Sequence, residues 1–327
     1  MSDFSRRSAL QAIGLATTTF LPGLAFSQDK YPSRPITLIV PQPAGGDADA
    51  FCRTLQPKMQ EVLGQPLVID NRSGAAGNIG TAIGAKAASD GYTVTFVNQG
   101  TMAFNPHLYP STGYSLEQFE PVSHLASIDL VICCNPSVPA KNLKEFLELA
   151  RKNPGKFNYG TAGNGSANHL AGELLAAMAK IDIAHIPYRG GGPALVGAMA
   201  GDIQSVVAFP LAAMPLIQSG KLRALAVTGA RRAMALPDVP TVAESGVPGY
   251  EFSSWFGFVV PKGTSADIVN RINSAALAAL KTPQVSERLL GGMTQPIGST
   301  PQAFSQLMSQ ENARWEKLIK QFNIKAD

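Results

Sequence analysis

Apolar, strand-like runs recur along the chain, and most of them precede a turn of small residues and a segment of helical periodicity. "ITLIV" leads into "PQPAGGDADA" and a helix predicted from about 49 to 63, and "PLVID" leads into "NRSGAAGNIG" and a helix reaching about 88. Alternation of this kind is typical of open sheets with helices on their faces. The sequence therefore predicts an α/β fold.

The same unit recurs in the second part of the chain. After the strand-like run "VSHLASIDLVICC", a helix is predicted at 143–152, and "KFNYG" leads into "TAGNGSANH", where Ser166 is suited to cap the next helix. "AHIPY" leads into "RGGGPAL", further strands follow, and three helices are predicted at the C-terminus. Since 327 residues exceed one typical hydrophobic core, two lobes are expected.

Composition and charge exclude several classes of protein. Apolar residues make up 45% of the chain and charged residues 15%, as in ordinary globular proteins. The formal net charge of +4 is small and no basic run occurs, so nucleic acid is not an expected partner. The chain has no CxxC pair, and Cys52, Cys133 and Cys134 lie on apolar runs. Buried free thiols are therefore expected rather than a redox or zinc site.

The N-terminus has the features of an export signal. Arg6 and Arg7 precede an apolar stretch at 12–20, and small residues follow up to Ser27. Residues 1–27 are predicted to be removed near Ser27/Gln28, and the paired arginines leave twin-arginine and ordinary Sec export both open. No later apolar run approaches the roughly 18 residues that span a bilayer. The expected location of the mature chain is a bacterial periplasm.

The small-residue turns after strands are candidate ligand sites. In open α/β sheets, ligands bind beyond the carboxyl ends of the strands, where helix N-termini present unpaired N–H groups and a partial positive charge. A carboxylate or phosphate fits that environment, and small residues let it approach. Each turn alone is explained equally well by tight packing of helix on strand. Four turns at equivalent positions favour a binding cleft between two lobes.

Known catalytic and cofactor motifs are missing from the sequence. It contains no GxSxG, HExxH, GxGxxG or GxxxxGK[ST] pattern, and the four histidines lack close metal-ligand spacing: His107, His124, His169 and His185. No catalytic residue, metal or cofactor is therefore predicted.

Five polar side chains near the turns have alternative interpretations. Asp47 and Asp49 are either paired carboxylates or, more simply, N-terminal caps at a helix start, in which case Asp49 holds its loop in shape. Asp47 either caps the same helix or faces the cleft, where it would repel anions or attract an amino group. His169 either donates a hydrogen bond to a ligand or has a capping or packing role. Tyr188 and Arg189 either wall and charge a pocket, or are a packed tyrosine beside a solvated arginine.

Long stretches of the chain resemble the Bug family of periplasmic solute receptors, the substrate-binding components of tripartite tricarboxylate transporters. The similar stretches include "RPITLIVPQPAGGDAD", "VIDNRSGAAGNIG", "KNPGKFNYGTAGNGSANHLAGELL", "IAHIPYRGGGPAL" and "PIGSTPQAF", and they run in order over nearly all of the mature chain. Gln42, Ala44, Asp47 and Ala208 depart from the residues that many relatives have. These departures bear on which solute is bound.

The resemblance implies a type II periplasmic-binding-protein fold of the Venus-flytrap kind, with a ligand cleft between two α/β lobes. The expected lobes are 28–124 plus 231–327, and 125–230. The expected function is non-enzymatic: a monomer captures a small carboxylated solute and delivers it to membrane permease subunits. A solute sensor for a signalling system and, less in keeping with the motifs, an exported hydrolase on a similar scaffold are the alternatives. The predicted ligand-binding residues are Gln42, Ala44, Gly45, Asp47, Asp49, Ser73, Gly74, Ala75, Ala76, Gly77, Asn78, Thr101, Thr161, Ala162, Gly163, Asn164, Gly165, Ser166, His169, Tyr188, Arg189, Gly190 and Phe209.

Overall fold

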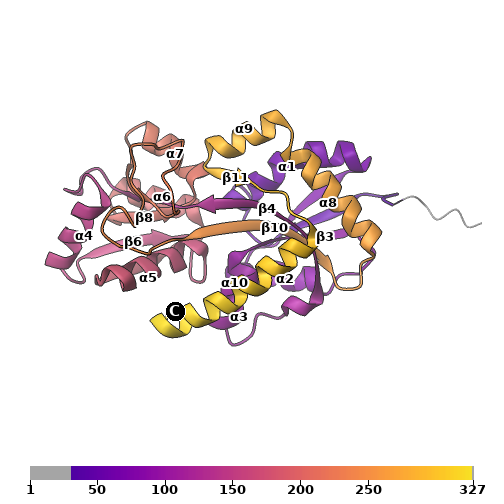
Figure 1. Cartoon of the computed structure of the whole chain (residues 1–327), viewed down its shortest axis with the longest axis horizontal. Coiled ribbons are helices and arrows are strands. Elements are labelled where there is room, and N and C mark those ends of the chain that lie inside the picture. The colour runs from indigo at the N-terminus through magenta and orange to yellow at the C-terminus, as the bar shows by residue number, and fades with distance from the viewer. Residues whose placement is uncertain (1–30, 326–327) are drawn as a thin grey trace, which may run out of the picture. The chain divides into compact units, whose positions relative to one another are not determined.

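The computed structural model describes residues 31–325, of which those from Pro32 onward belong to one compact unit. Two β-sheets with flanking helices build this unit (Figure 1). The predicted α/β fold is thereby confirmed. The predicted export signal 1–27 and its cleavage near Ser27/Gln28 lie outside the described residues.

The six-stranded sheet and its helices are called the first lobe. Its strand order is β11-β4-β10-β3-β1-β2, in which β1 is parallel to β2 and β3 while β10 is antiparallel to β3 and β4. Its strands are β1 (Ile36–Val40), β2 (Leu67–Asn71), β3 (Thr93–Asn98), β4 (Phe119–Asp129), β10 (Ser253–Pro261) and β11 (Thr294–Pro296). Its helical segments are α1 (Asp47–Leu63), η1 (Ala75–Gly77), α2 (Asn78–Ala85), the π-helix η2 (Gly100–Phe104), α3 (Asn105–Leu108), η3 (Leu116–Gln118), α8 (Ala266–Leu280), α9 (Pro283–Gly291) and α10 (Pro301–Phe322).

The five-stranded sheet and its helices are called the second lobe. Its strand order is β7-β6-β8-β5-β9, with β6 parallel to β7 and β8 and with β5 antiparallel to β8 and β9. Its strands are β5 (Val131–Cys134), β6 (Phe157–Thr161), β7 (Ile183–Pro187), β8 (Ser205–Ala208) and β9 (Arg223–Val227). Its helices are α4 (Leu143–Lys152), α5 (Ala167–Ala179), α6 (Gly191–Ala200) and α7 (Pro210–Gln218).

Two chain segments pass side by side from one lobe to the other. The single strand expected over 122–134 is in fact β4 and β5, which belong to different sheets and are separated by Leu130. The Leu130 N–H donates to Thr228 Oγ1 (2.8 Å), and the Thr228 N–H donates to the Leu130 carbonyl (3.0 Å). Thr228 directly follows β9, and the Phe252 N–H before β10 donates to its carbonyl (2.9 Å). This backbone pairing joins the two connections where the sheets change over.

Helix α10 packs against both lobes. Phe304 and Met308 lie in the apolar cluster of the first lobe that includes Val97 and Trp255. Farther along the helix, Trp315 and Ile319 lie in a cluster that contains apolar residues of α4 and α5. In Figure 1 the yellow α10 accordingly runs from the first lobe toward α5. The lobe limits expected from the sequence, 28–124 plus 231–327 and 125–230, remain a proposal.

Local predictions for cysteines and the cap at Ser166 are confirmed. Cys52, Cys133 and Cys134 are free and buried, and burial raises the pKa of each thiol. The Ser166 Oγ accepts the His169 N–H (3.2 Å) and caps α5. Within residues 31–325, none of the helices combines the length and apolar character needed to cross a bilayer.

Candidate functional site

The loop between β1 and α1 is held by Asp49. The Gly45 N–H and the Arg53 Nε both donate to Asp49 Oδ2, each at 2.9 Å, so the prediction that Asp49 shapes this loop is confirmed. Burial opposes ionisation of Asp49, but these hydrogen bonds outweigh it and the pKa lies below its usual value. The Asn71 side chain donates to the Gln42 carbonyl (3.1 Å) and ties the loop to the end of β2.

Asp47 begins α1 and lies against the second lobe. The residue before it, Gly46, is the N-cap, so Asp47 occupies the first helical turn rather than the cap itself. Its Oδ2 lies 3.6 Å from the point where a Cβ on Gly191, the first residue of α6, would be. Burial raises the pKa of Asp47 from 3.8 to about 6, and a hydrogen bond with its own backbone only partly opposes this. An acidic group that is readily protonated thus lies where the two lobes approach each other.

The second glycine loop follows β2 and is anchored by Asn105. Asn105 Nδ2 donates to the Ala76 carbonyl (3.1 Å) and to Asn78 Oδ1 (2.7 Å), and Asn105 is fully buried. Thr101 is also buried and caps its own turn by accepting from and donating to Asn98. The segment "NQGTMAFNP", which overlaps the end of β3, is largely helical and forms η2 and the start of α3. Asn105 thus ties the start of α3 to the glycine loop that follows β2.

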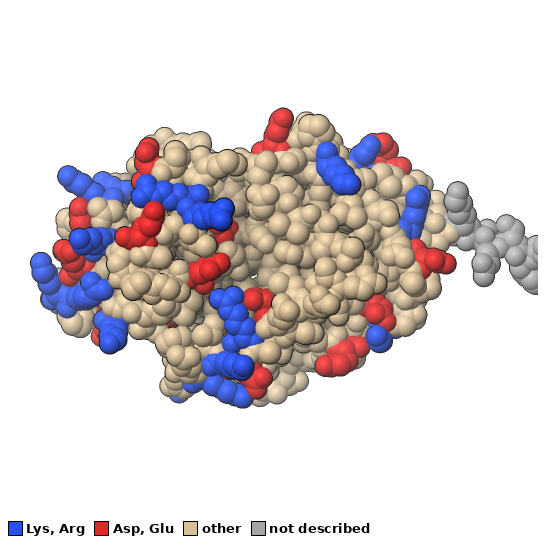
Figure 2. Space-filling model, viewed as in Figure 1, with Lys and Arg blue, Asp and Glu red and all other residues tan. Residues whose placement is uncertain are grey.

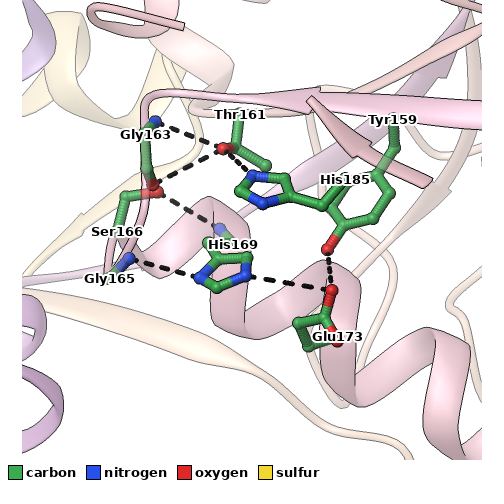
Figure 3. A network of polar contacts seen from close by, with 8 residues as sticks. All are labelled: Tyr159, Thr161, Gly163, Gly165, Ser166, His169, Glu173 and His185. Carbon is green, nitrogen blue, oxygen red and sulfur yellow. Dashed lines mark hydrogen bonds and ion pairs between the residues drawn. The ribbon is translucent and has the colours of Figure 1, made fainter. Parts of the chain in front are cut away.

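The corresponding loop of the second lobe joins β6 to α5 (Figure 3). Thr161 Oγ1 accepts the Gly163 N–H (3.2 Å), and His169 Nδ1 accepts the Gly165 N–H (3.2 Å). Gly163 and Gly165 have φ values of +122° and +73°, which residues other than glycine rarely adopt. The loop is thus shaped by glycine geometry and by two side chains that accept its N–H groups.

The turn between β7 and α6 combines a packed tyrosine with an exposed arginine. A Cβ on Gly160 would lie 3.3 Å from the Tyr188 ring, and a Cβ on Gly197 would lie 2.3 Å from the Tyr188 hydroxyl. Both glycines therefore make room for this side chain. Arg189 is exposed, and Gly190, the N-cap of α6, has a φ of +117°. For Tyr188 the packing interpretation agrees with these contacts. A pocket-wall role remains a prediction.

Loops from the two lobes meet at three places. The Tyr109 hydroxyl donates to the Asn164 carbonyl (3.2 Å), and a Cβ on Gly165 would lie 2.9 Å from Asn105 Oδ1. Asp47 faces Gly191 as described above. Phe209, which precedes α7, packs on Phe256 of β10 with ring centroids 5.7 Å apart. Three predicted residues of the second lobe, Asn164, Gly165 and Phe209, thus contact the first lobe, at partners that were not predicted.

The predicted site residues differ in how far they are reached by solvent. The exposed ones are Ala44, Gly45, Ser73, Ala75, Ala76 and Arg189. The buried ones are Asp49, Gly77, Asn78, Thr101, Thr161, Gly165 and His169. The partly buried ones are Gln42, Asp47, Gly74, Ala162, Gly163, Asn164, Ser166, Tyr188, Gly190 and Phe209.

The space at the lobe junction is small. A cavity of about 10 Å³ is lined by Asp47, Phe51, Phe209, Phe256 and neighbouring side chains. This volume holds no more than one water molecule. An organic acid could enter here only if Phe209 and Asp47 separate, which a movement of the lobes would achieve. A larger cavity of about 570 Å³ lies on the first lobe, between residues 106–118 and Asn312, and includes none of the predicted site residues.

Tyr109, Asn105, Glu173 and His185 were not predicted to belong to the site. Tyr109 and Asn105 follow η2, and no glycine turn or motif marks them in the sequence. His185 lies opposite Tyr159 in the parallel pairing of β6 and β7, so the strand register could have indicated its proximity. Glu173 lies one helical turn after His169, a spacing that places both on one helix face.

Charges and potential metal ligands are dispersed. On the face in Figure 2, Lys and Arg gather mainly over the second lobe, interspersed with Asp and Glu. Residues 31–325 contain no group of three or more His, Cys, Asp or Glu side chains placed to hold a metal ion. The donors available to an anion at the glycine loops are therefore mainly backbone N–H groups at helix starts.

Comparison with known proteins decides the family. The family described as the tripartite tricarboxylate transporter family receptor matches residues 51–324. The chain belongs to this receptor family. The predicted resemblance is thereby confirmed, and the chain is a solute-binding receptor rather than an enzyme.

Solved structures of related receptors agree with the two-lobed fold. The periplasmic binding protein BugD is 32% identical, with a TM-score of 0.85 over 90% of this chain and 99% of BugD. An R. palustris protein solved with adipate is 36% identical, with a TM-score of 0.87 over 90% of this chain and 99% of that one. MatC from Rhodopseudomonas palustris, with bound malate, is 31% identical, with a TM-score of 0.83 over 88% and 100%. The predicted periplasmic-binding-protein fold is confirmed.

Gly77→Ala and Gly45→Ala form a matched pair that tests the crowding of the first glycine loop. Both glycines have positive φ, +92° and +78°, but a Cβ on Gly77 would lie 3.0 Å from Thr101 and 3.3 Å from the Pro41 carbonyl, whereas Gly45 has open space. We expect Gly45→Ala to lower the free energy of unfolding by about 1 kcal/mol and Gly77→Ala by about 2 kcal/mol. Denaturant unfolding measures the difference, and equal losses would contradict the crowding argument.

Proposed function

We propose that this receptor captures a small mono- or dicarboxylate between its lobes in the periplasm and delivers it, as a monomer, to the membrane permease of a tripartite transporter. The observation that carries the proposal is the contact of glycines of the second lobe with helix starts of the first, Gly165 with Asn105 of α3 and Gly191 with Asp47 of α1. Related receptors solved with adipate and with malate support a carboxylate as the ligand class.

Backbone groups supply the chemistry of the proposed capture. Helices α1, α5 and α6 all begin at the predicted loops, so each directs unpaired N–H groups and a partial positive charge toward them. A carboxylate accepts such hydrogen bonds without a buried arginine or lysine. The predicted residues from Gln42 to Phe209 are proposed to enclose the solute when the lobes close. Phe209, whose ring packs at a tilt against Phe256, would form the apolar side of the enclosure.

A panel of organic acids tests this function on the mature protein. An acid present at 100 times its dissociation constant should raise the free energy of unfolding by about 2.7 kcal/mol, because it binds only the folded state. Thermal unfolding across mono- and dicarboxylates of increasing length, followed by calorimetry on those that stabilise, measures this. Native mass spectrometry of the protein as isolated serves as the control for retained ligand. Absence of stabilisation by every acid, together with a retained ligand that has no carboxylate, would refute the proposed ligand class.

A further inference from the structure

Two histidines and their partners lie directly behind the glycine loop of the second lobe. In Figure 3 the rings of His169, on α5, and His185, on β7, face each other, and their centroids are 4.1 Å apart with planes 20° from parallel. His185 Nε2 shares a hydrogen bond with Thr161 Oγ1 (2.6 Å). The Tyr159 hydroxyl donates to Glu173 Oε1 (2.6 Å). The network thus joins side chains from β6, α5 and β7 of the second lobe.

His169 forms two hydrogen bonds with the loop between β6 and α5. It is the third residue of α5, and its backbone N–H donates to Ser166 Oγ while its Nδ1 accepts the Gly165 N–H (3.2 Å). This arrangement resembles a capping box, in which a side chain at the third helical position reaches back to a free N–H before the helix. An imidazole can do this only when Nδ1 carries no proton.

The surroundings keep the His169 ring neutral, so that its Nδ1 can accept a hydrogen bond. Its ring is 3% exposed, and burial together with neighbouring His185 lowers its pKa to about 3. The groups that face it are His185 from β7 and Glu173 on its own helix, whose Oε1 lies 3.8 Å from Nε2 and also accepts from Tyr159 of β6. With Nδ1 accepting from Gly165, the ring proton of the neutral form is on Nε2, toward Glu173.

The supported loop is also one of the parts of the second lobe that touch the first. Asn164 accepts a hydrogen bond from Tyr109, and Gly165 packs on Asn105 with room for no Cβ. A Cβ on Gly100 would lie 3.3 Å from the Gly165 carbonyl. The position of Gly165 therefore affects both the N–H groups offered to a solute and the contact made when the lobes close.

We propose that His169 is a positioning residue for solute capture, which acts by accepting the Gly165 N–H through Nδ1 and thereby fixing the loop that closes against Tyr109 and Asn105. This inference rests on the proposed function and deepens it, because His169 then serves the solute through the loop rather than by direct contact. The assignment differs from a direct role, in which Nε2 would donate to the ligand.

Asparagine and glutamine at position 169 separate the two roles. Asparagine places its side-chain oxygen where Nδ1 lies, whereas glutamine places its oxygen near Nε2. With the acid that stabilises the wild type best, we expect His169→Leu and His169→Gln to weaken binding about tenfold, because the Gly165 N–H is left unpaired. His169→Asn should restore most of this loss. Calorimetry gives the dissociation constants, and Tyr109→Phe serves as a comparison that removes the lobe contact alone.

A second readout needs no ligand. In the free protein, hydrogen exchange of the Gly165 amide should be slow in the wild type, in His169→Asn and in Tyr109→Phe, and should be at least tenfold faster in His169→Leu and His169→Gln. The wild-type amide should keep one NMR chemical shift from about pH 8 down to about pH 5, since the imidazole is neutral throughout this range.

The outcomes are distinguishable. Tight binding by His169→Gln with weak binding by His169→Asn would overturn the proposal in favour of direct donation through Nε2. Hydrogen exchange of the Gly165 amide at the wild-type rate in His169→Leu, His169→Gln and His169→Asn would overturn it as well. If no acid binds the wild type, the proposed function fails, whereas the exchange pattern still decides whether His169 positions the loop. Should His169→Leu not fold, the asparagine and glutamine variants carry the same comparison.

Discussion

Asp47→Asn is expected to tighten the binding of a dicarboxylate about 100-fold at about pH 8. Asp47 Oδ2 lies beside Gly191 at the start of α6, one of the helix N-termini proposed to hold the solute. A carboxylate about 6 Å away repels a bound anion by about 2.8 kcal/mol at an effective dielectric constant of about 20. Asparagine keeps the size of the side chain and removes the charge, so this repulsion disappears.

The pKa of Asp47 determines how its effect on ligand affinity changes with pH. Because burial raises the pKa of Asp47 to about 6, the wild-type carboxyl is largely neutral below that pH and charged above it. The affinity advantage of Asp47→Asn over the wild type for a dicarboxylate should therefore be large at about pH 8 and small at about pH 5, since titration of the ligand affects both proteins alike. Calorimetry at both pH values measures it.

Glu61→Gln is the matched control for Asp47→Asn. Glu61 is an exposed acid near the other end of α1, paired with Lys58, so its substitution changes the net charge equally without altering the lobe junction. An amine-bearing acid gives the opposite expectation, since Asp47 would attract its ammonium group and Asp47→Asn would weaken its binding. Equal affinities of wild type and Asp47→Asn for both kinds of acid would show that Asp47 does not face the solute.

Trp315→Ala is expected to lower the free energy of unfolding by about 4 kcal/mol. The Trp315 ring is 1% exposed and packs on Phe104 and Phe252, with centroids 4.6 Å and 5.5 Å away, while its Nε1 donates to Glu311 (3.2 Å). Removing an aromatic side chain of this size leaves a cavity whose cost is typically 3–5 kcal/mol, or about 4 kcal/mol here.

Trp315→Phe keeps most of the packing and should cost about half as much. Urea unfolding followed by circular dichroism measures both variants. Because Trp315 packs on Phe104 of η2 and on Phe252 just before β10, the alanine variant should also loosen the attachment of α10 to η2. A loss below about 1 kcal/mol in Trp315→Ala would contradict the assigned packing.

Periodicity predicts the individual elements well because it depends on local burial. The strand "ITLIV" coincides with β1, and the helix expected at 143–152 coincides with α4. Local capping chemistry was equally informative at Ser166 and Asp49, where partners lie within four residues. Such features need no knowledge of the tertiary fold.

Features that depend on distant partners could not be predicted from the residues. The break at Leu130 lies inside a run that has the pattern of one strand, and its hydrogen-bond partner Thr228 is 98 positions away. The stacking of His169 on His185 follows from the register of β6 with β7, which turn patterns leave open. The ligand-binding residue set and the lobe limits remain predictions, since each depends on how a solute and the two lobes come together.

The two sheets differ in how much of the chain each one needs. The five-stranded sheet is complete once residues 131–227 are present, whereas the six-stranded sheet joins strands from 36–98 with β10 and β11 far downstream. Contacts between residues close in sequence lose less loop-closure entropy and form sooner. We therefore expect the sheet of the second lobe to form before the six-stranded sheet, which must wait for the two ends of the chain to come together.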